Sequence, residues 1–150
     1  MKILQYFVVA LAFLLTVPAQ ADDRLPAVPY ANINYAQLVD LLQKGGLLID
    51  IRRPDEWQKT GVIRGSKTIT LFDRSGKVQP DFFQKLKQAA PDPRRPVAVI
   101  CRTGNRSRAG SQILKQLGYK RVYNVKNGIT GWLREGLKVE RYPASRRRER

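Results

Sequence analysis

Short apolar runs alternate with segments of helical character along most of the chain, and this alternation restricts the fold more than any other feature. Continuous apolar runs of this kind are typical of strands that are buried on both faces. Strands that alternate with helices favour a mainly parallel sheet that is covered by helices on both faces. The expected strands are Leu47–Ile51, Lys67–Leu71, Val97–Cys101 and Arg121–Val125. The sequence therefore predicts an α/β fold.

Five helical segments are expected around these strands. Asn34 has a side chain suited to capping a helix that runs to about Lys44. Pro54 suits the first position of a short helix, which Gly61 would end. The other helices are expected over residues 80–90, 107–117 and 129–134.

The chain of 150 residues is long enough for one domain, which we expect over residues 34–140. Residues 22–33 contain two prolines and are expected to form an irregular lead-in. Residues 141–150 end in "SRRRER", and a run of cations like this is typical of a solvated basic tail.

The first 21 residues have the pattern of a secretory signal peptide. Lys2 supplies a positive start, residues 7–17 are apolar apart from one threonine, and Ala19-Gln20-Ala21 offers a small-x-small cleavage site. We expect cleavage after Ala21 and a periplasmic or secreted mature chain. The alternative is an uncleaved anchor or a buried helix.

The formal net charge of +16 favours anionic partners. Nucleic acid is not expected, because an exported protein rarely meets it. The basic tail could make weak contact with anionic surfaces, whereas a small anionic substrate suits the rest of the charge.

Cys101 is the single cysteine, and it ends the third predicted strand. An exported chain with one cysteine cannot form an internal disulfide, so the thiol is either buried and inert or kept for its reactivity. Ligands of parallel α/β sheets bind just beyond the carboxyl ends of strands. Gly104 permits an unusual backbone angle in the loop that follows, and Ser107 can cap the next helix.

The chain contains no histidine. This excludes a Cys–His nucleophile pair and any histidine-centred metal site, and no metal or cofactor is expected. A thiolate at Cys101 would have to be prepared by loop amides and by Arg102 and Arg106. Such a nucleophile suits a sulfur–sulfur bond, whose leaving group needs little protonation.

The stretch from about Tyr35 to Val139 resembles the rhodanese-like sulfurtransferases. "LIDIRRPDEWQKTGVIRGSKTI" is similar to the first signature of the family, "VICRTGNRS" to the active-site strand and its six-residue loop, and "VYNVKNGITGWLREGLKV" to the closing signature. The chain departs from the family at Val62, where a histidine is usual, and at Asn127, where a glycine is usual. The resemblance implies a three-layer sandwich with about five strands in the sheet.

The resemblance also implies that Cys101 carries sulfur as a persulfide. A donor such as thiosulfate would supply the sulfur, and cyanide or a thiol would accept it. Positive charge would offset the repulsion between two anions. The expected substrate-binding residues are Arg102, Thr103, Gly104, Asn105, Arg106 and Ser107. Asp50, Arg52 and Glu56 are expected to support the loops through ion pairs and capping, and Trp57 and Trp132 to pack in the core.

Two other functions remain open at this stage. A cysteine phosphatase of the same fold would use Cys-x5-Arg, which requires an arginine at position 107, where this chain has Ser107. The shorter loop therefore favours sulfur over phosphate. The second alternative is a non-catalytic module that carries sulfur for a partner or binds through its basic surface.

Overall fold

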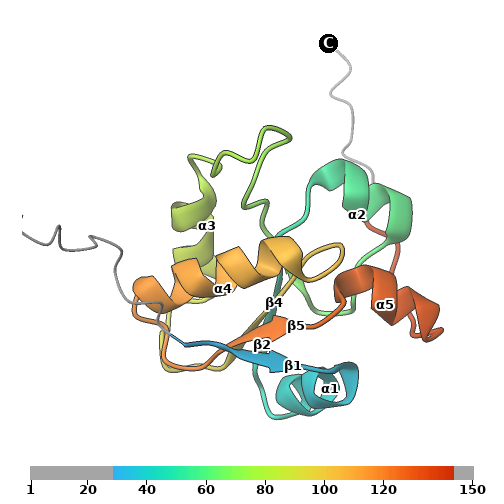
Figure 1. The fold of residues 1–150 in the computed structure, drawn as a ribbon, viewed down its shortest axis with the longest axis horizontal. Coiled ribbons are helices and arrows are strands. Elements are labelled where there is room, and N and C mark those ends of the chain that lie inside the picture. The colour runs from blue at the N-terminus through green and yellow to red at the C-terminus, as the bar shows by residue number, and fades with distance from the viewer. Residues whose placement is uncertain (1–28, 144–150) are drawn as a thin grey trace, which may run out of the picture.

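The computed structural model describes residues 29–143, which form a parallel five-stranded sheet with five helices (Figure 1). The strand order is β1-β5-β4-β2-β3, and each neighbouring pair is parallel. The predicted fold class is therefore confirmed. The strands are β1 (Ala31–Ile33), β2 (Leu47–Asp50), β3 (Lys67–Thr68), β4 (Val97–Ile100) and β5 (Val122–Val125). The helices are α1 (Tyr35–Gln43), α2 (Pro54–Thr60), α3 (Phe82–Ala89), α4 (Asn105–Gln116) and α5 (Gly128–Arg134).

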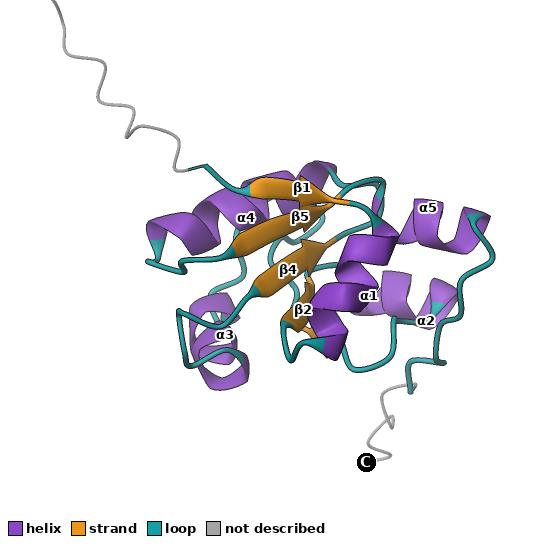
Figure 2. Cartoon of the chain, turned by 90° about the horizontal axis from the view of Figure 1, so that it is seen from below, coloured by secondary structure: helices purple, strands orange, loops and turns teal. Residues whose placement is uncertain are grey.

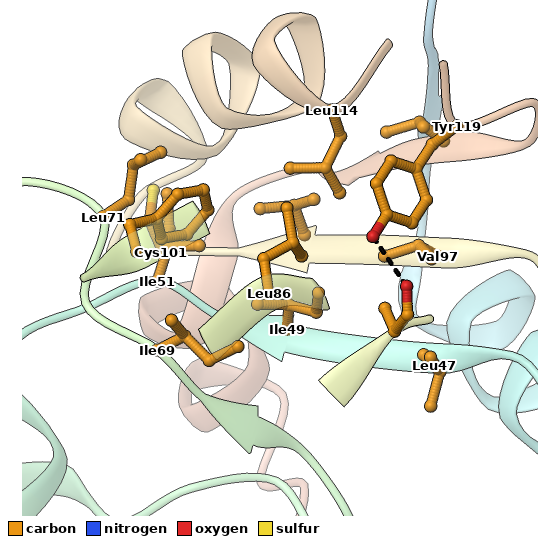
Figure 3. Close-up of a cluster of buried hydrophobic side chains, with 14 residues drawn as sticks. Leu47, Ile49, Ile51, Ile69, Leu71, Leu86, Val97, Cys101, Leu114 and Tyr119 are labelled. Atoms are coloured by element: carbon orange, nitrogen blue, oxygen red, sulfur yellow. Dashed lines mark hydrogen bonds between the residues drawn. The ribbon is translucent and has the colours of Figure 1, made fainter. Parts of the chain in front are cut away.

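Helices cover the sheet from both sides, which gives the three layers predicted by the sequence (Figure 2). On one face, α3 and α4 pack Phe82, Leu86 and Leu114 against the sheet, in the cluster that Figure 3 shows. On the other face, α1 and α5 pack Leu38 and Trp132 against it. Alternate residues of β2 and β4 enter the two clusters, because side chains alternate between the faces of a strand. These strands are buried at every residue.

Local sequence determines where α1 and α2 begin. Asn34 accepts a hydrogen bond from the Gln37 amide at 2.9 Å, and the Gln37 side chain accepts one from the Asn34 amide at 3.0 Å. This reciprocal pair satisfies two amides that the helix itself leaves free. Pro54 begins α2, and the helix ends before Gly61, as predicted.

The structure corrects the expected boundaries at two strands. Residues 22–33 are not an irregular lead-in throughout, because Ala31–Ile33 forms edge strand β1, paired with β5. Strand β3 contains Lys67–Thr68 rather than the whole of Lys67–Leu71. The expected signal peptide and most of the basic tail lie outside the described residues. Within residues 29–143, no helix has the length and apolar character that a membrane span requires.

A buried ion pair lies at the carboxyl end of β2. Asp50 and Arg52 are each 1% exposed, and the Arg52 guanidinium donates to Asp50 Oδ2 at 2.6 Å. The same guanidinium donates to Thr60 Oγ1 at 2.6 Å and to the Gly61 carbonyl at 2.9 Å. Arg52 therefore joins the end of β2 to the end of α2.

Removal of one partner should destabilise the fold strongly, because it leaves an uncompensated charge in the interior. We expect Asp50→Ala to lower the free energy of unfolding by about 3–5 kcal/mol, measured by urea denaturation. The control is Asp40→Ala, which breaks the exposed pair with Lys44 and should cost about 0.3–0.5 kcal/mol. Equal losses in the two variants would contradict the structural role of Asp50.

Candidate active site

The loop that follows β4 contains Cys101 and turns directly into α4. Gly104 precedes the helix with a φ of 93°, and a Cβ there would lie 3.2 Å from the Asn127 amide nitrogen. A glycine is therefore required by the backbone angle and by the close approach of Asn127. Helix α4 begins at Asn105, so the expectation that Ser107 caps a helix from 107 is wrong. Ser107 instead lies inside the first turn and is fully buried.

The sulfur of Cys101 lies beneath this loop. Cys101 is 1% exposed, and Figure 3 shows it beside Leu71 and Ile51. The Gly104 amide donates to Sγ at 3.2 Å, and the Ser107 hydroxyl oxygen lies 3.3 Å from Sγ. A backbone N–H of the loop and a hydroxyl group of α4 thus lie within hydrogen-bond distance of the sulfur, and such groups suit a site for an anion. Because the sulfur is covered, a substrate reaches it only if the loop or its side chains move.

The start of α5 fixes the loop from the opposite side. The amides of Ile129 and Thr130 donate to the carbonyls of Cys101 and Arg102, at 2.9 and 3.0 Å. Asn127 and Gly128 both have positive φ, and a Cβ on Gly128 would collide with the Cys101 carbonyl. Asparagine tolerates the left-handed region better than most residues, so Asn127 can replace the usual glycine while Gly128 cannot be replaced.

The other departure from the family pattern, Val62, is explained by its backbone. The Val62 amide donates to the Glu140 carbonyl at 2.9 Å, and the Glu140 amide donates back at 2.7 Å. This bridge joins the segment after α2 to the end of the domain. It uses main-chain atoms only, so it does not require the histidine that is usual at this position.

Arg106 forms an ion pair that the sequence analysis missed. Its guanidinium donates to both carboxylate oxygens of Glu56, at 2.8 and 2.5 Å. Burial acts to raise the pKa of Glu56, but hydrogen bonds from Arg106 and from the Arg53 amide outweigh it, so the pKa lies below its ordinary value. The hydrogen bonds that Arg106 donates to Glu56 raise the pKa of Arg106. Arg106 therefore ties α4 to α2, and Glu56 compensates much of its charge.

Arg102 is placed differently from Arg106. It is exposed, and within the described range no carboxylate pairs with it. It lines a cleft of about 430 Å³ between α2 and α5, together with Arg53, Lys59, Ile129 and Leu133. This volume falls within the range of small-molecule sites. The cleft lies next to the Cys101 loop through Arg102, and its lining combines cations and apolar side chains with the carboxylates of Asp55 and Glu56.

The remaining predicted residues divide into three groups. Asp50, Arg52 and Glu56 hold loops and helices in place, and Trp57 and Trp132 are buried. Thr103 and Asn105 line a smaller hollow of about 230 Å³ on the far side of the loop. Within residues 29–143, no three Cys, Asp or Glu side chains cluster in a way that could hold a metal ion.

Asn124 is the site residue that the sequence analysis missed. It is 2% exposed within β5, and its Oδ1 accepts a hydrogen bond from the Ser107 hydroxyl at 2.6 Å. The available signal was a polar residue inside the otherwise apolar run "RVYNV", since a buried polar side chain requires a partner.

A single cysteine at the carboxyl edge of a parallel sheet, under a short cationic loop whose amide meets the sulfur, defines a rhodanese-like domain. The chain belongs to this family: the family model described as "Rhodanese-like domain" matches residues 34–135.

Similar proteins agree with this assignment. The chain is 35% identical to the rhodanese domain-containing protein CG4456 of Drosophila melanogaster over 94 residues, which cover 60% of this chain and 85% of that protein. It is 29% identical to the thiosulfate sulfurtransferase GlpE of Tolumonas auensis over 104 residues, which cover 69% and 88%. The crystal structure of Rv0390 from M. tuberculosis has a TM-score of 0.66 at 27% identity and covers 76% of this chain and 100% of that chain. Family and relatives together support sulfurtransferase activity in general.

The Glu56–Arg106 pair should couple α2 to α4 in a pH-dependent way. In a double-mutant cycle of Glu56→Gln and Arg106→Gln, we expect a coupling free energy of about 1–2 kcal/mol at neutral pH. The folded-state pKa of Glu56 is lowered, so its stabilisation is complete above its ordinary value of 4.5 and is lost as the pH falls through the folded-state pKa.

The measurement is urea denaturation of the four proteins at neutral pH and at several acidic pH values. The exposed Arg64–Glu140 pair, mutated in the same way, is the control and should show weak coupling. A Glu56–Arg106 coupling that stayed constant while Glu56 became protonated would contradict the assignment.

Proposed function

We propose that the chain transfers sulfane sulfur from thiosulfate, or a related anionic donor, through a persulfide on Cys101 to cyanide or a thiol. The observation that carries the proposal is the single cysteine at the end of β4, with the Gly104 amide directed at its sulfur. The rhodanese-like family of the chain supports the same reaction.

The reaction balances with no redox partner beyond donor and acceptor. The Cys101 thiolate attacks the outer sulfur of thiosulfate, the sulfur–sulfur bond of the donor breaks, and sulfite leaves with the bonding electron pair. The acceptor then attacks the outer sulfur of the persulfide. Cyanide becomes thiocyanate, or a thiolate becomes a persulfide, and the Cys101 thiolate is restored.

Arg102 is the cation that we assign to the donor. A thiolate and a dianion repel each other, and positive charge at the site lowers the cost of their approach. Glu56 compensates Arg106, whereas Arg102 is exposed at the mouth of the cleft beside the loop. Arg106 then contributes mainly by holding the loop.

The persulfide can be detected directly by mass. Incubation with thiosulfate should add the mass of one sulfur atom to the wild-type protein and none to Cys101→Ser, because the chain has no other cysteine. Cyanide should remove the added mass and yield thiocyanate, measured by colour with ferric ion. A thermal unfolding midpoint equal to that of the wild type would show that Cys101→Ser is folded. Equal turnover in Cys101→Ser would contradict the proposal.

The role of Arg102 can be separated from the general positive charge of the chain. We expect Arg102→Ala to lower kcat/KM for thiosulfate about tenfold, chiefly through KM, because one hydrogen bond to a charged group is lost. Arg94→Ala is the control, since it removes the same charge from the segment before β4, at the opposite edge of the sheet. Equal effects of the two substitutions would refute a local role for Arg102.

A further inference from the structure

The Ser107 hydroxyl lies between two groups that can both accept its hydrogen. Its oxygen is 2.6 Å from Asn124 Oδ1 and 3.3 Å from Cys101 Sγ. All three residues are at most 2% exposed, so their hydrogen bonding depends mainly on one another. A hydroxyl group has one hydrogen, and it can donate fully to only one of the two neighbours at a time.

The thiol form of Cys101 agrees with the arrangement as it stands. The Ser107 hydroxyl donates to Asn124 Oδ1 over the short distance, and the Cys101 S–H can donate to the Ser107 oxygen. Each of these two hydrogens then has one acceptor, and both Ser107 Oγ and Asn124 Oδ1 have a donor.

The anionic form of Cys101 requires a different arrangement. A thiolate has no hydrogen to give, so the Ser107 hydroxyl must turn and donate to Sγ. The oxygens of Ser107 and Asn124 would then face each other at 2.6 Å with no hydrogen between them. Rotation of the Asn124 side-chain amide by half a turn removes this repulsion, because it brings an NH₂ group to the Ser107 oxygen.

Asn32 on strand β1 can accommodate the rotation of the Asn124 side-chain amide. Asn124 Nδ2 donates to Asn32 Oδ1 at 2.8 Å, and the two asparagines are register partners on the parallel strands β5 and β1. If Asn124 turns, its oxygen needs a new donor, and the Asn32 side chain supplies one by the same rotation. Asn32 is exposed, so water can satisfy the other hydrogen-bonding groups of its side-chain amide in either orientation.

We propose that Asn32, Asn124 and Ser107 form a reversible hydrogen-bond chain that reverses direction when the Cys101 sulfur becomes anionic. In the reversed state, every member donates toward the sulfur, and the thiol proton has left to water. Ser107 and Asn124 are positioning residues that stabilise the reactive anion. The inference deepens the proposed function, since it rests on the anion of Cys101 as the nucleophile.

Charged groups around the loop also act on the sulfur, and they are the same in both arrangements. Substitution of Ser107 by alanine changes none of these charges, so a comparison of variants isolates the hydroxyl group. These charged groups are Arg102 on the loop, Arg106 and Arg108 on α4, Arg53 just before α2, Glu56 on α2, Asp50 at the end of β2, Arg52 just after β2, and Lys126 after β5.

Alkylation of Cys101 by iodoacetamide across a pH series tests the hydroxyl group. The rate follows the thiolate fraction, and we expect the pH midpoint in Ser107→Ala to lie about one unit above that of the wild type. Ser111→Ala is the matched control, because Ser111 is equally buried one turn further along α4 and its hydroxyl makes no hydrogen bond. A midpoint in Ser107→Ala equal to that in Ser111→Ala would overturn the inference.

A second measurement needs no substitution in the chain of hydrogen bonds. In ¹⁵N-labelled wild-type protein, the side-chain amide resonances of Asn124 should shift with pH at the midpoint of Cys101 alkylation. In Cys101→Ser the same resonances should not shift over that range. Asn124 resonances that stay constant while Cys101 ionises would refute the reversal.

These readouts are independent of sulfur transfer. If the persulfide fails to form but the coupled shifts appear, the proposed function fails and the hydrogen-bond chain stands. If sulfur transfer proceeds while the midpoints and resonances stay unchanged, the hydrogen-bond chain is wrong.

Discussion

The buried pair of Asp50 and Arg52 is the interaction on which the geometry of the site depends. A guanidinium in the interior is tolerated only if its charge and its donors are matched, and here Asp50, Thr60 and the Gly61 carbonyl match them. Those partners fix α2 relative to β2. Helix α2 in turn presents Glu56 to Arg106, and Arg106 lies in the first turn of the helix that closes over Cys101. The Asp50–Arg52 pair at the sheet thus helps to position the loop, because it fixes α2 and the Glu56–Arg106 pair joins α2 to α4.

The environment of the sulfur is built largely from backbone groups. Gly104 and Gly128 allow main-chain segments to approach within distances that a Cβ would prevent, and α5 amides hold the carbonyls of Cys101 and Arg102. A loop held in this way is preorganised, so its N–H groups need little rearrangement when charge develops on the sulfur. The chain tolerates Val62 because its bridge to Glu140 uses main-chain atoms only, and it tolerates Asn127 because asparagine can adopt the positive φ that this position requires.

The sequence predicts those features that arise from local pattern. The apolar runs, the cap at Asn34 and the proline at the first position of α2 define β2, β4, β5, α1 and α2, and the cysteine follows a strand in the order that parallel sheets use. Strand β1 has three residues at the sheet edge, too few for a periodic signal, and it exists through its pairing with β5. Glu56 and Arg106 are 50 residues apart, so only the folded chain brings them together. The start of α4 was misplaced because Gly104, rather than a side-chain cap, sets it.

The pairing of β1 with β5 means that the working unit is longer than the segment that the family model matches. A fragment limited to residues 34–135 would lack β1 and would leave β5 with one unpaired edge, a surface on which another chain can add a strand. It would also lack Tyr142, whose ring packs against Trp57 at a centroid distance of 5.1 Å. Minimal versions of this domain therefore have to retain both flanks, because the first completes the sheet and the second packs against Trp57 of α2.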